Sequence, residues 1–175
     1  MATVSAPVQL ATRSGIELQI RPATDFDELQ LIRFFKQVSE DDRRFRFLEA
    51  ADHLGHAQVE PLVHVDHLRS ESFLAFETGE GKLVATGQLV CDEKFETAEV
   101  AVSVRADFRG KGVGWAMLEK LADEAHRRGV RRVISIEDRA NTAAIALEQE
   151  CGFVAEPLAL DPALVMLTKS FEQPA

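Results

Sequence analysis

Tyrosine is absent from this sequence of 175 residues, and cysteine and tryptophan are scarce. The two cysteines, Cys91 and Cys151, are too far apart for a CxxC redox or metal motif, so we expect free, buried thiols and a reducing, cytoplasmic setting. Positive charge is also limited, with 20 basic against 29 acidic residues. Because phosphate contacts need clustered lysine and arginine, nucleic acid is not an expected partner. The acidic balance favours solubility or, as the alternative, a cationic substrate.

Long apolar runs are missing too. No stretch approaches the ~18–20 apolar residues of a membrane span, and residues 1–7 have neither the basic start nor the apolar run of a secretory signal. The hydrophobic share of 46% is ordinary for a globular protein, and this length suits one well-buried core. We therefore expect a single domain over residues 1–175 with no membrane partner, as either a monomer or an oligomer.

One glycine-rich run departs from this ordinary composition. Residues 109–114 read Arg-Gly-Lys-Gly-Val-Gly, between an alternating, strand-like stretch and an amphipathic, helix-like stretch. A strand that passes through glycines into a helix leaves backbone N–H groups unpaired at the positive end of the helix dipole, where phosphate binds. The glycines let a pyrophosphate approach the backbone, and Arg109 and Lys111 add charge. The run predicts a phosphate cradle, with a plain tight turn as the alternative.

The flanking residues narrow the kind of cradle. A nucleoside-triphosphate loop ends in Gly-Lys-Ser/Thr, whereas Lys111 is followed by Gly112 and no hydroxyl. A dinucleotide-binding loop lies near the start of a βαβ unit, whereas this run lies past the middle of the chain. Its Arg-x-x-Gly-x-Gly pattern and its lead-in over residues 102–108 instead resemble the acyl-CoA loop of the GCN5-related N-acetyltransferase (GNAT) family.

The resemblance to this family extends over nearly the whole chain. Residues 16–24 resemble the family's opening strand, and residues 141–144 with residues 151–153 resemble its last helix and the entry to its final strand. The resemblance implies an α/β GNAT fold, with a mixed, mostly antiparallel twisted sheet of about six or seven strands flanked by about four helices. The sheet is expected to part near the end of the strand over residues 98–104 to receive the pantetheine arm.

The resemblance also implies an activity, the direct transfer of acetyl from acetyl-CoA, as co-substrate, to a primary amine. Residues 39–47 are similar to the acetyltransferase domain of bacterial protein-lysine acetyltransferases, so a protein lysine is the expected acceptor. Two alternatives stay open: an acetyltransferase that acts on a small-molecule amine, and a non-catalytic acyl-CoA-binding sensor. No metal is needed, because positioning and one base meet most demands of this chemistry.

Hydrophobic patterning predicts the order of the elements. Thr24, followed three residues later by an aspartate, predicts the start of a first helix whose apolar face carries Phe26, Leu29, Phe35 and Val38. Further expected elements are strands over residues 8–12, 16–20, 73–76, 82–90, 98–104 and 133–136 and near residues 153 and 166, and helices that begin near residues 39, 113 and 141.

Glu99 is the candidate catalytic base. A free lysine amine has a pKa of about 10.4, so at pH 7 it must lose a proton before it attacks a thioester. In the alternating strand over residues 98–104, Glu99 shares its face with Ala101 and Ser103, just upstream of the glycine-rich run. Similar family members carry a glutamate base on this strand. The alternative is a solvent-facing carboxylate or a partner in an ion pair.

The residues expected to bind acetyl-CoA come from this strand, the glycine-rich run and the start of the last helix. Asn141 is predicted to cap that helix and, from the family resemblance, to lie beside the pantetheine arm. The candidate set is Val102, Val104, Arg109, Gly110, Lys111, Gly112, Val113, Gly114, Trp115 and Asn141.

Family members often have a tyrosine in the last helix that protonates the departing CoA thiolate, and this chain has none. Glu148 occupies the matching position when the sequences are aligned on Gly152 and Phe153. A thiol with a pKa near that of cysteine, about 8.5, is a tolerable leaving group, so the acid is dispensable or replaced by water. Glu148 could donate a proton only with a strongly raised pKa, and we expect an exposed helix residue instead.

Histidines form two His-x-x-His pairs, His53 with His56 and His64 with His67. This spacing on a helix can present two imidazoles to one metal, but no cysteine cluster accompanies them. We expect surface or helix-packing histidines, with Asp66 bonded to His67, and no metal site.

Overall fold

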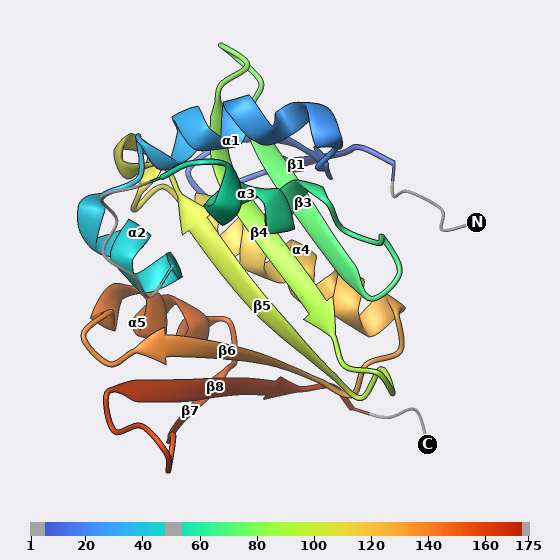
Figure 1. The fold of residues 1–175 in the computed structure, drawn as a ribbon, viewed down its shortest axis with the longest axis vertical. Coiled ribbons are helices and arrows are strands. Elements are labelled where there is room, and N and C mark those ends of the chain that lie inside the picture. Colours follow the sequence, from blue (N-terminus) through green and yellow to red (C-terminus); the bar gives the residue numbers. More distant parts are fainter. Residues whose placement is uncertain (1–5, 48–53, 173–175) are drawn as a thin grey trace.

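The protein is described by a computed structural model over residues 6–47 and 54–172. Within these residues eight strands form one sheet in the order β1-β2-β3-β4-β5-β6-β8-β7, flanked by five α-helices (Figure 1). The elements are β1 (Val8–Ala11), β2 (Glu17–Pro22), the 3₁₀ turn η1 (Asp25–Asp27), α1 (Glu28–Phe35), α2 (Glu40–Phe47), α3 (His56–Val63), β3 (Ser70–Glu77), β4 (Leu83–Cys91), β5 (Thr97–Val104), the 3₁₀ turn η2 (Ala106–Phe108), α4 (Val113–Arg127), β6 (Arg132–Asp138), α5 (Thr142–Glu150), β7 (Val154–Pro157) and β8 (Leu164–Ser170).

The expected mixed, mostly antiparallel sheet is confirmed. Every neighbouring pair of strands is antiparallel except β5 and β6, which are parallel and are connected through α4. The described residues contain somewhat more strands and helices than the six or seven and four expected. The helix that patterning missed is α3, which contains Pro61, because an internal proline and mixed polar residues hide its periodicity.

β5 and β6 pair only over their first residues, from Thr97 opposite Arg132 to Glu99 opposite Ile134. Beyond Glu99 the two strands separate toward α2 and α5 (Figure 1). Each strand remains paired along its length on its other side, β5 with β4 and β6 with β8. The opening therefore lies between two paired edges and begins just past Glu99, earlier along β5 than the expected position near the end of this strand.

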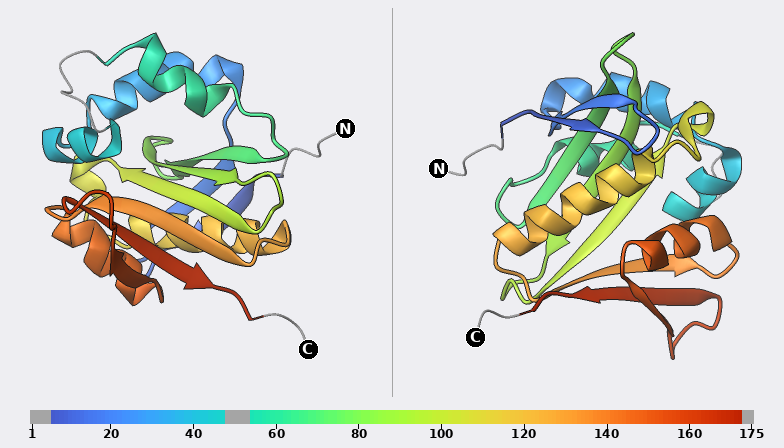
Figure 2. Two further views of the ribbon diagram at one scale, coloured as in Figure 1. Left: turned by 60° about the horizontal axis from the view of Figure 1, so that its bottom comes forward. Right: turned by 180° about the vertical axis from the view of Figure 1, so that it is seen from behind.

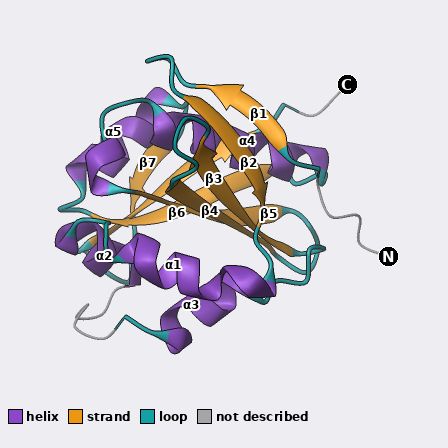
Figure 3. Cartoon of the chain, turned by 90° about the horizontal axis from the view of Figure 1, so that it is seen from above, coloured by secondary structure: helices purple, strands orange, loops and turns teal. Residues whose placement is uncertain are grey.

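Helices cover both faces of the sheet, α4 and α5 on one side and α1 and α3 on the other (Figure 3). On the first side Met117 and Leu121 of α4 are fully buried. The helix lies so close to β4 that a Cβ on Gly87 would come within 2.8 Å of Met117. On the second side Leu31 and Phe35 of α1 form a separate core with α3. These two cores hold the sheet from both faces and leave the β5–β6 opening uncovered by either.

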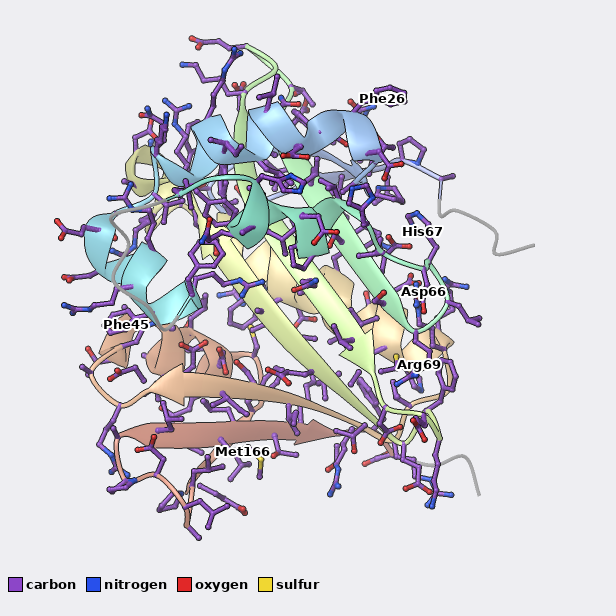
Figure 4. All side chains as sticks on the ribbon, viewed as in Figure 1. Phe26, Phe45, Asp66, His67, Arg69 and Met166 are labelled. Atoms are coloured by element: carbon purple, nitrogen blue, oxygen red, sulfur yellow. The ribbon has the colours of Figure 1, made fainter. Side chains whose placement is uncertain are left out.

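The first helix begins as expected but turns a different face to the sheet. Asp27 accepts a hydrogen bond from the backbone N–H of Thr24 at 2.7 Å, which confirms the predicted start. The 3₁₀ turn η1 then precedes α1 and, at fewer residues per turn, rotates the residues at the start. Phe26 is 96% exposed and Leu29 is 68% exposed, and Phe26 points away from the sheet in Figure 4. The expected apolar face is wrong at these two positions and right at Phe35, which is fully buried.

The histidines bind separate carboxylates. His53 lies outside the described residues. Residues 1–5, part of the N-terminal segment that lacks the features of a secretory signal, also lie outside them. The expected bond from Asp66 to His67 is wrong, because an oxygen of Asp66 accepts three backbone N–H groups of the following turn instead; both residues are labelled in Figure 4. The observed contacts are His56 with Glu28 (2.6 Å), His64 with Asp25 (3.0 Å) and His67 with Glu71 (2.9 Å).

Cys91 and Cys151 are both free and buried, as expected, and burial raises the pKa of both thiols. None of the helices in residues 6–47 and 54–172 combines the length and apolar character needed to cross a bilayer.

Candidate active site

A cavity of about 670 Å³ lies in the opening between β5 and β6, a size typical of small-molecule and cofactor sites. One wall consists of β5 and the turn into α4, and the opposite wall of β6 and α5, with α2 at the open end (Figures 1 and 2). Its lining includes Asp42, Phe45 and Arg46 of α2, residues 99–104 of β5, Arg109, Gly110, Gly112, Gly114 and Trp115 of the turn and α4, Ser135 and Glu137 of β6, and Asn141, Leu147 and Glu148 at α5.

The glycine-rich run forms the turn into α4. Gly110 and Gly112 have φ angles of 71° and 79°, a conformation that strains residues with a Cβ. The first helical turn carries the backbone N–H groups of Val113, Gly114 and Trp115, and no acceptor within the described residues takes them. They lie at the positive end of the helix dipole. The turn therefore has the free donors and close backbone approach that a pyrophosphate needs.

Gly114 lets the two walls of the cavity lie close together. A Cβ on Gly114 would lie 3.0 Å from Cδ2 of Leu147 and 3.5 Å from Cγ2 of Val104, and both of these side chains line the cavity. A Cβ on Gly112 would instead lie 3.4 Å from the backbone nitrogen of Arg13 in the β1–β2 turn. Gly114 thus controls the width of the cavity, whereas Gly112 controls the path of the backbone.

The turn is braced from two directions. Ser14 in the β1–β2 turn donates a hydrogen bond from Oγ to the carbonyl oxygen of Lys111 at 2.6 Å. From the other side, Nη1 of Arg109 lies 3.4 Å from Oδ2 of Asp42 on α2. These contacts connect the glycine-rich run to elements from the first third of the chain.

Most candidate acetyl-CoA residues line the cavity, and two do not. The side chain of Val113 is fully buried in the core under α4. The Nζ atom of Lys111 lies 5.1 Å from the ring centre of Phe108, and Lys111 is not among the lining residues. The side chains at these two positions are therefore not part of the cavity wall. The candidates that do line it are Val102, Val104, Arg109, Gly110, Gly112, Gly114, Trp115 and Asn141.

Glu99 occupies the apex of the opening, at the last position where β5 pairs with β6. Its side chain is exposed and lines the cavity. No hydrogen bond or ion pair within the described part of the chain engages its carboxylate. This carboxylate is therefore free to accept a proton from a group that enters the cavity.

Arg46 of α2 is a positive charge at the site that sequence reasoning missed. Its guanidinium donates to Oε1 of Gln88 on β4 at 2.9 Å. Burial lowers the pKa of Arg46, and the charges of Glu99 and Glu137 oppose this effect. Arginine remains cationic under such shifts. Helix α2 has acidic residues in its first turn and arginines after them, and no feature of the sequence distinguishes the arginine that lines the cavity.

Glu148 is buried, so the expected exposed position is wrong. It is 6% exposed, because α5 turns this residue toward β6. There Oγ of Ser135 lies 3.0 Å from Oε1 of Glu148 and 3.3 Å from Oε1 of Glu137. Asn141 donates from Nδ2 to Oε2 of Glu137 at 3.0 Å. The only sequence signal for this cluster is the polar alternation of Ser135 and Glu137 in a strand otherwise rich in valine and isoleucine.

Asn141 has two structural roles at this wall. Besides its bond to Glu137, its Oδ1 accepts from the backbone N–H of Ala144 at 3.4 Å, so the predicted helix cap is confirmed. The cap holds the start of α5 against the end of β6.

The sequence profile of the acetyltransferase (GNAT) family matches residues 25–153. The chain belongs to the GNAT family. It is an acetyltransferase of the class that uses acyl-CoA, and the matched residues include both walls of the cavity.

Individual relatives agree with this assignment. Acetyltransferase PA5475 of Pseudomonas aeruginosa is 30% identical over 145 residues, which cover 81% of this chain and 77% of that protein. The ribosomal protein bS18-alanine N-acetyltransferase of Escherichia coli K12 is 39% identical over 89 residues, 49% of this chain and 57% of that protein. The crystal structure of the GNAT domain of S. lividans PAT has a TM-score of 0.86 at 25% identity, covering 94% of this chain and 97% of that one. The whole GNAT fold is therefore present here.

A metal has no evident place in this site. Within residues 6–47 and 54–172 no three His, Cys, Asp or Glu side chains gather in an arrangement that could hold one. The polar groups available in the cavity include its backbone N–H groups, its carboxyl groups, Asn141 and the arginines Arg46 and Arg109.

Proposed function

We propose that this GNAT enzyme transfers acetyl from acetyl-CoA directly to a primary amine, with Glu99 as the general base. The observation that carries the proposal is the position of Glu99, a free carboxylate at the apex of an opening whose β5 wall leads on to the glycine-rich turn. One cavity can then hold both substrates, and such positioning contributes much of the rate of a bimolecular reaction.

The turn into α4 is proposed to bind the pyrophosphate of acetyl-CoA. The free N–H groups of the first helical turn supply donors, and Arg109 adds a positive charge at the cavity wall. The pantetheine arm is proposed to run along the cavity past Val104 and Leu147, two lining side chains that lie next to Gly114. Asn141 lines the cavity beyond this point.

Glu99 is proposed to act on the amine. At pH 7 a lysine ε-amine is protonated, and producing the neutral form costs roughly 4–5 kcal/mol. A carboxylate beside the bound ammonium can take this proton before nitrogen attacks, and general base catalysis typically accelerates such a step by about 10²–10⁴-fold.

The proposed acceptor is a lysine side chain of a protein. Residues 39–47, which resemble protein-lysine acetyltransferases, contain the whole of α2, and α2 contributes Asp42, Phe45 and Arg46 to the cavity. Phe45 lies at the end of α2 nearest to α5 in Figure 4. The net charge of −9 favours a cationic acceptor at low ionic strength, and a lysine side chain has the length to reach the apex of the opening.

The acceptor is tested by competition. The enzyme is incubated with acetyl-CoA and an equimolar mixture of three acceptors: a folded protein with free lysines and a blocked N-terminus, the same protein with methylated lysines and a free N-terminal alanine, and a polyamine. The second acceptor is included because the E. coli relative acts on an alanine amine. Mass spectrometry locates the acetyl group, and a parallel reaction with Glu99→Gln sets the background.

The expected result is acetylation of the lysines well above that background. Preferential acetylation of the polyamine or of the N-terminal alanine would overturn the lysine acceptor and leave the acetyltransferase assignment intact. Tight binding of acetyl-CoA without CoA release against any amine would instead favour a sensor.

A further inference from the structure

We propose that Glu137 and Glu148 share a single proton and that Glu148 delivers it to the CoA thiolate as the acetyl group leaves. This places an acid on the wall opposite the base Glu99. The inference rests on the proposed function above, because it needs acetyl-CoA in the cavity between β5 and β6.

The first support is the geometry around one hydroxyl group. Oγ of Ser135 contacts a carboxyl oxygen of Glu148 at 3.0 Å and one of Glu137 at 3.3 Å. A serine hydroxyl has one proton, so it can donate to only one of these oxygens. If both carboxyls were ionised, the other contact would place two lone pairs against each other. A proton on one carboxyl turns that contact into a hydrogen bond, so the arrangement is satisfied with one proton between the two groups.

The second support is an oxygen without a partner. Oε2 of Glu148 is buried and has no hydrogen-bond partner within the described residues, although Glu148 itself lines the cavity. A buried, ionised and unpaired oxygen would be costly, whereas the neutral acid has a much smaller desolvation penalty.

The charges around the pair favour Glu148 as the site of the proton. Burial, followed by the charge of Glu137, raises the pKa of Glu148 to about 9. Burial raises the pKa of Glu137 as well, but Asn141 and Ser135 donate to it and Arg46 lowers its pKa from the opposite side of the cavity. The other charged or titratable groups around α5 are Glu99 on β5, Cys151 at the end of α5, and Glu119 of α4, which pairs with Lys169 of β8 at 3.7 Å.

The proposed step balances as follows. The ammonium first loses one proton to Glu99, which releases it to solvent. The neutral amine nitrogen then forms a bond to the thioester carbon, and the C–S bond breaks with its electron pair on sulfur. Glu148 gives its proton to that sulfur, which leaves as CoA thiol, while the proton lost by the amine passes to Glu99. The products are the amide and CoA thiol. Glu99 then releases its proton to solvent, and the Glu137–Glu148 pair takes one up.

Two physical features suit the pair to this task. The pKa of Glu148, about 9, is close to the pKa of a typical thiol, about 8.5. Proton transfer between the two groups therefore has only a small free-energy difference in either direction. After donation both carboxyls are ionised at short range in a poorly solvated site, and their mutual repulsion drives rapid reprotonation. The pair is thus returned to its one-proton state before the next turnover.

The kinetic test compares the parent enzyme with Glu148→Gln and with Glu156→Gln, an exposed carboxylate on β7, as the matched control. We expect Glu148→Gln to lower kcat by about 10²-fold, the lower end for a general acid because thiolates leave well, with acetyl-CoA binding by calorimetry within about twofold. The kcat of the parent should fall as pH rises through about 9. This alkaline limb of the pH profile should be absent in Glu148→Gln. The control should match the parent.

A second readout uses the protein without acetyl-CoA. Because the pKa of Glu148 is raised on folding, the native state binds more protons than the unfolded state between about pH 5 and 9, so stability falls as pH rises through this window. Glu148→Gln removes most of this dependence. The melting temperature of the variant minus that of the parent should therefore increase from pH 5 to pH 9.

The outcomes separate the proposals. An unchanged kcat in Glu148→Gln, or a lower kcat with the alkaline limb retained, would overturn the acid role. A pH-independent difference in melting temperature would overturn the shared proton. If Glu148→Gln fails to fold, the kcat profile of Glu137→Gln tests the proposal instead. Loss of the charge of Glu137 should move the alkaline fall in kcat, which reports Glu148, to lower pH. An unmoved fall in kcat would overturn the proposal. Failure of the parent to bind acetyl-CoA would overturn the proposed function, and the melting measurement would still test the proton.

Discussion

The two walls of the cavity carry the same side chain in opposite surroundings. Glu99 on β5 is exposed and engages no partner within the described residues, whereas Glu148 on α5 is buried and shares Ser135 with Glu137. The cause is the backbone around each one. β5 loses its neighbour beyond Glu99, so solvent reaches that carboxylate, whereas α5 packs Glu148 against β6. Glu99 is therefore open to solvent and to a second substrate, whereas burial raises the pKa of Glu148.

The walls also differ in what they offer acetyl-CoA. The wall at the start of α4 offers mainly backbone, in the form of free N–H groups and the gap left by Gly114. The β6–α5 wall offers side chains that touch only because two distant segments meet. Backbone donors at a helix start follow from local sequence, but contacts between distant side chains do not. Substitutions on the two walls should accordingly affect different steps.

The largest expected effect is that of Glu99→Gln. Loss of the base should lower kcat by about 10²–10⁴-fold, and acetyl-CoA binding should be nearly unchanged because Glu99 is proposed to act on the amine. CoA release and calorimetry measure the two quantities. Glu93→Gln, in the exposed turn before β5, is the control and should behave as the parent. Turnover within a fewfold of the parent between pH 6 and 9 would place the base elsewhere.

A smaller effect is expected for Gly114→Val. The new side chain would occupy the gap between Val104 and Leu147, so acetyl-CoA affinity should fall by about tenfold or more, equivalent to about 1.4 kcal/mol. The backbone at this position is helical, so the variant should fold. Asp123→Val places the same side chain on the exposed face of α4 and controls for helix propensity. Equal affinities in the two variants would show that acetyl-CoA does not pass between these walls.

The smallest effect is expected for Asn141→Ala. This change removes the cap of α5 and a donor to Glu137, and loss of such a cap costs about 1 kcal/mol of stability. Thr142→Ala, an exposed neighbour without a bond of this kind, is the control for denaturant unfolding. If the two variants were equally stable, Asn141 would not be what holds the start of α5.

Local patterns predicted more of the fold than of the site. The first hairpin, the capped start at Thr24 and the glycine-rich turn each depend on residues close in sequence, and each forms as expected. The first helix shows the limit, because one 3₁₀ turn was enough to expose Phe26 and Leu29. The glycine-rich run predicted the backbone of the turn but not the direction of the Lys111 side chain, which lies over Phe108.

The amino-acid sequence alone was sufficient for the family resemblance, the order of most elements and the candidacy of Glu99, because glycine spacing, capping residues and strand alternation act over a few residues. Only the tertiary structure decided the state of Glu148. Its burial depends on α5 packing against β6, and its proton depends on Ser135 and Glu137, which local patterning cannot bring into contact with it. The protonation of a carboxyl group is a property of its solvation and its neighbours, and both are set by how the chain folds.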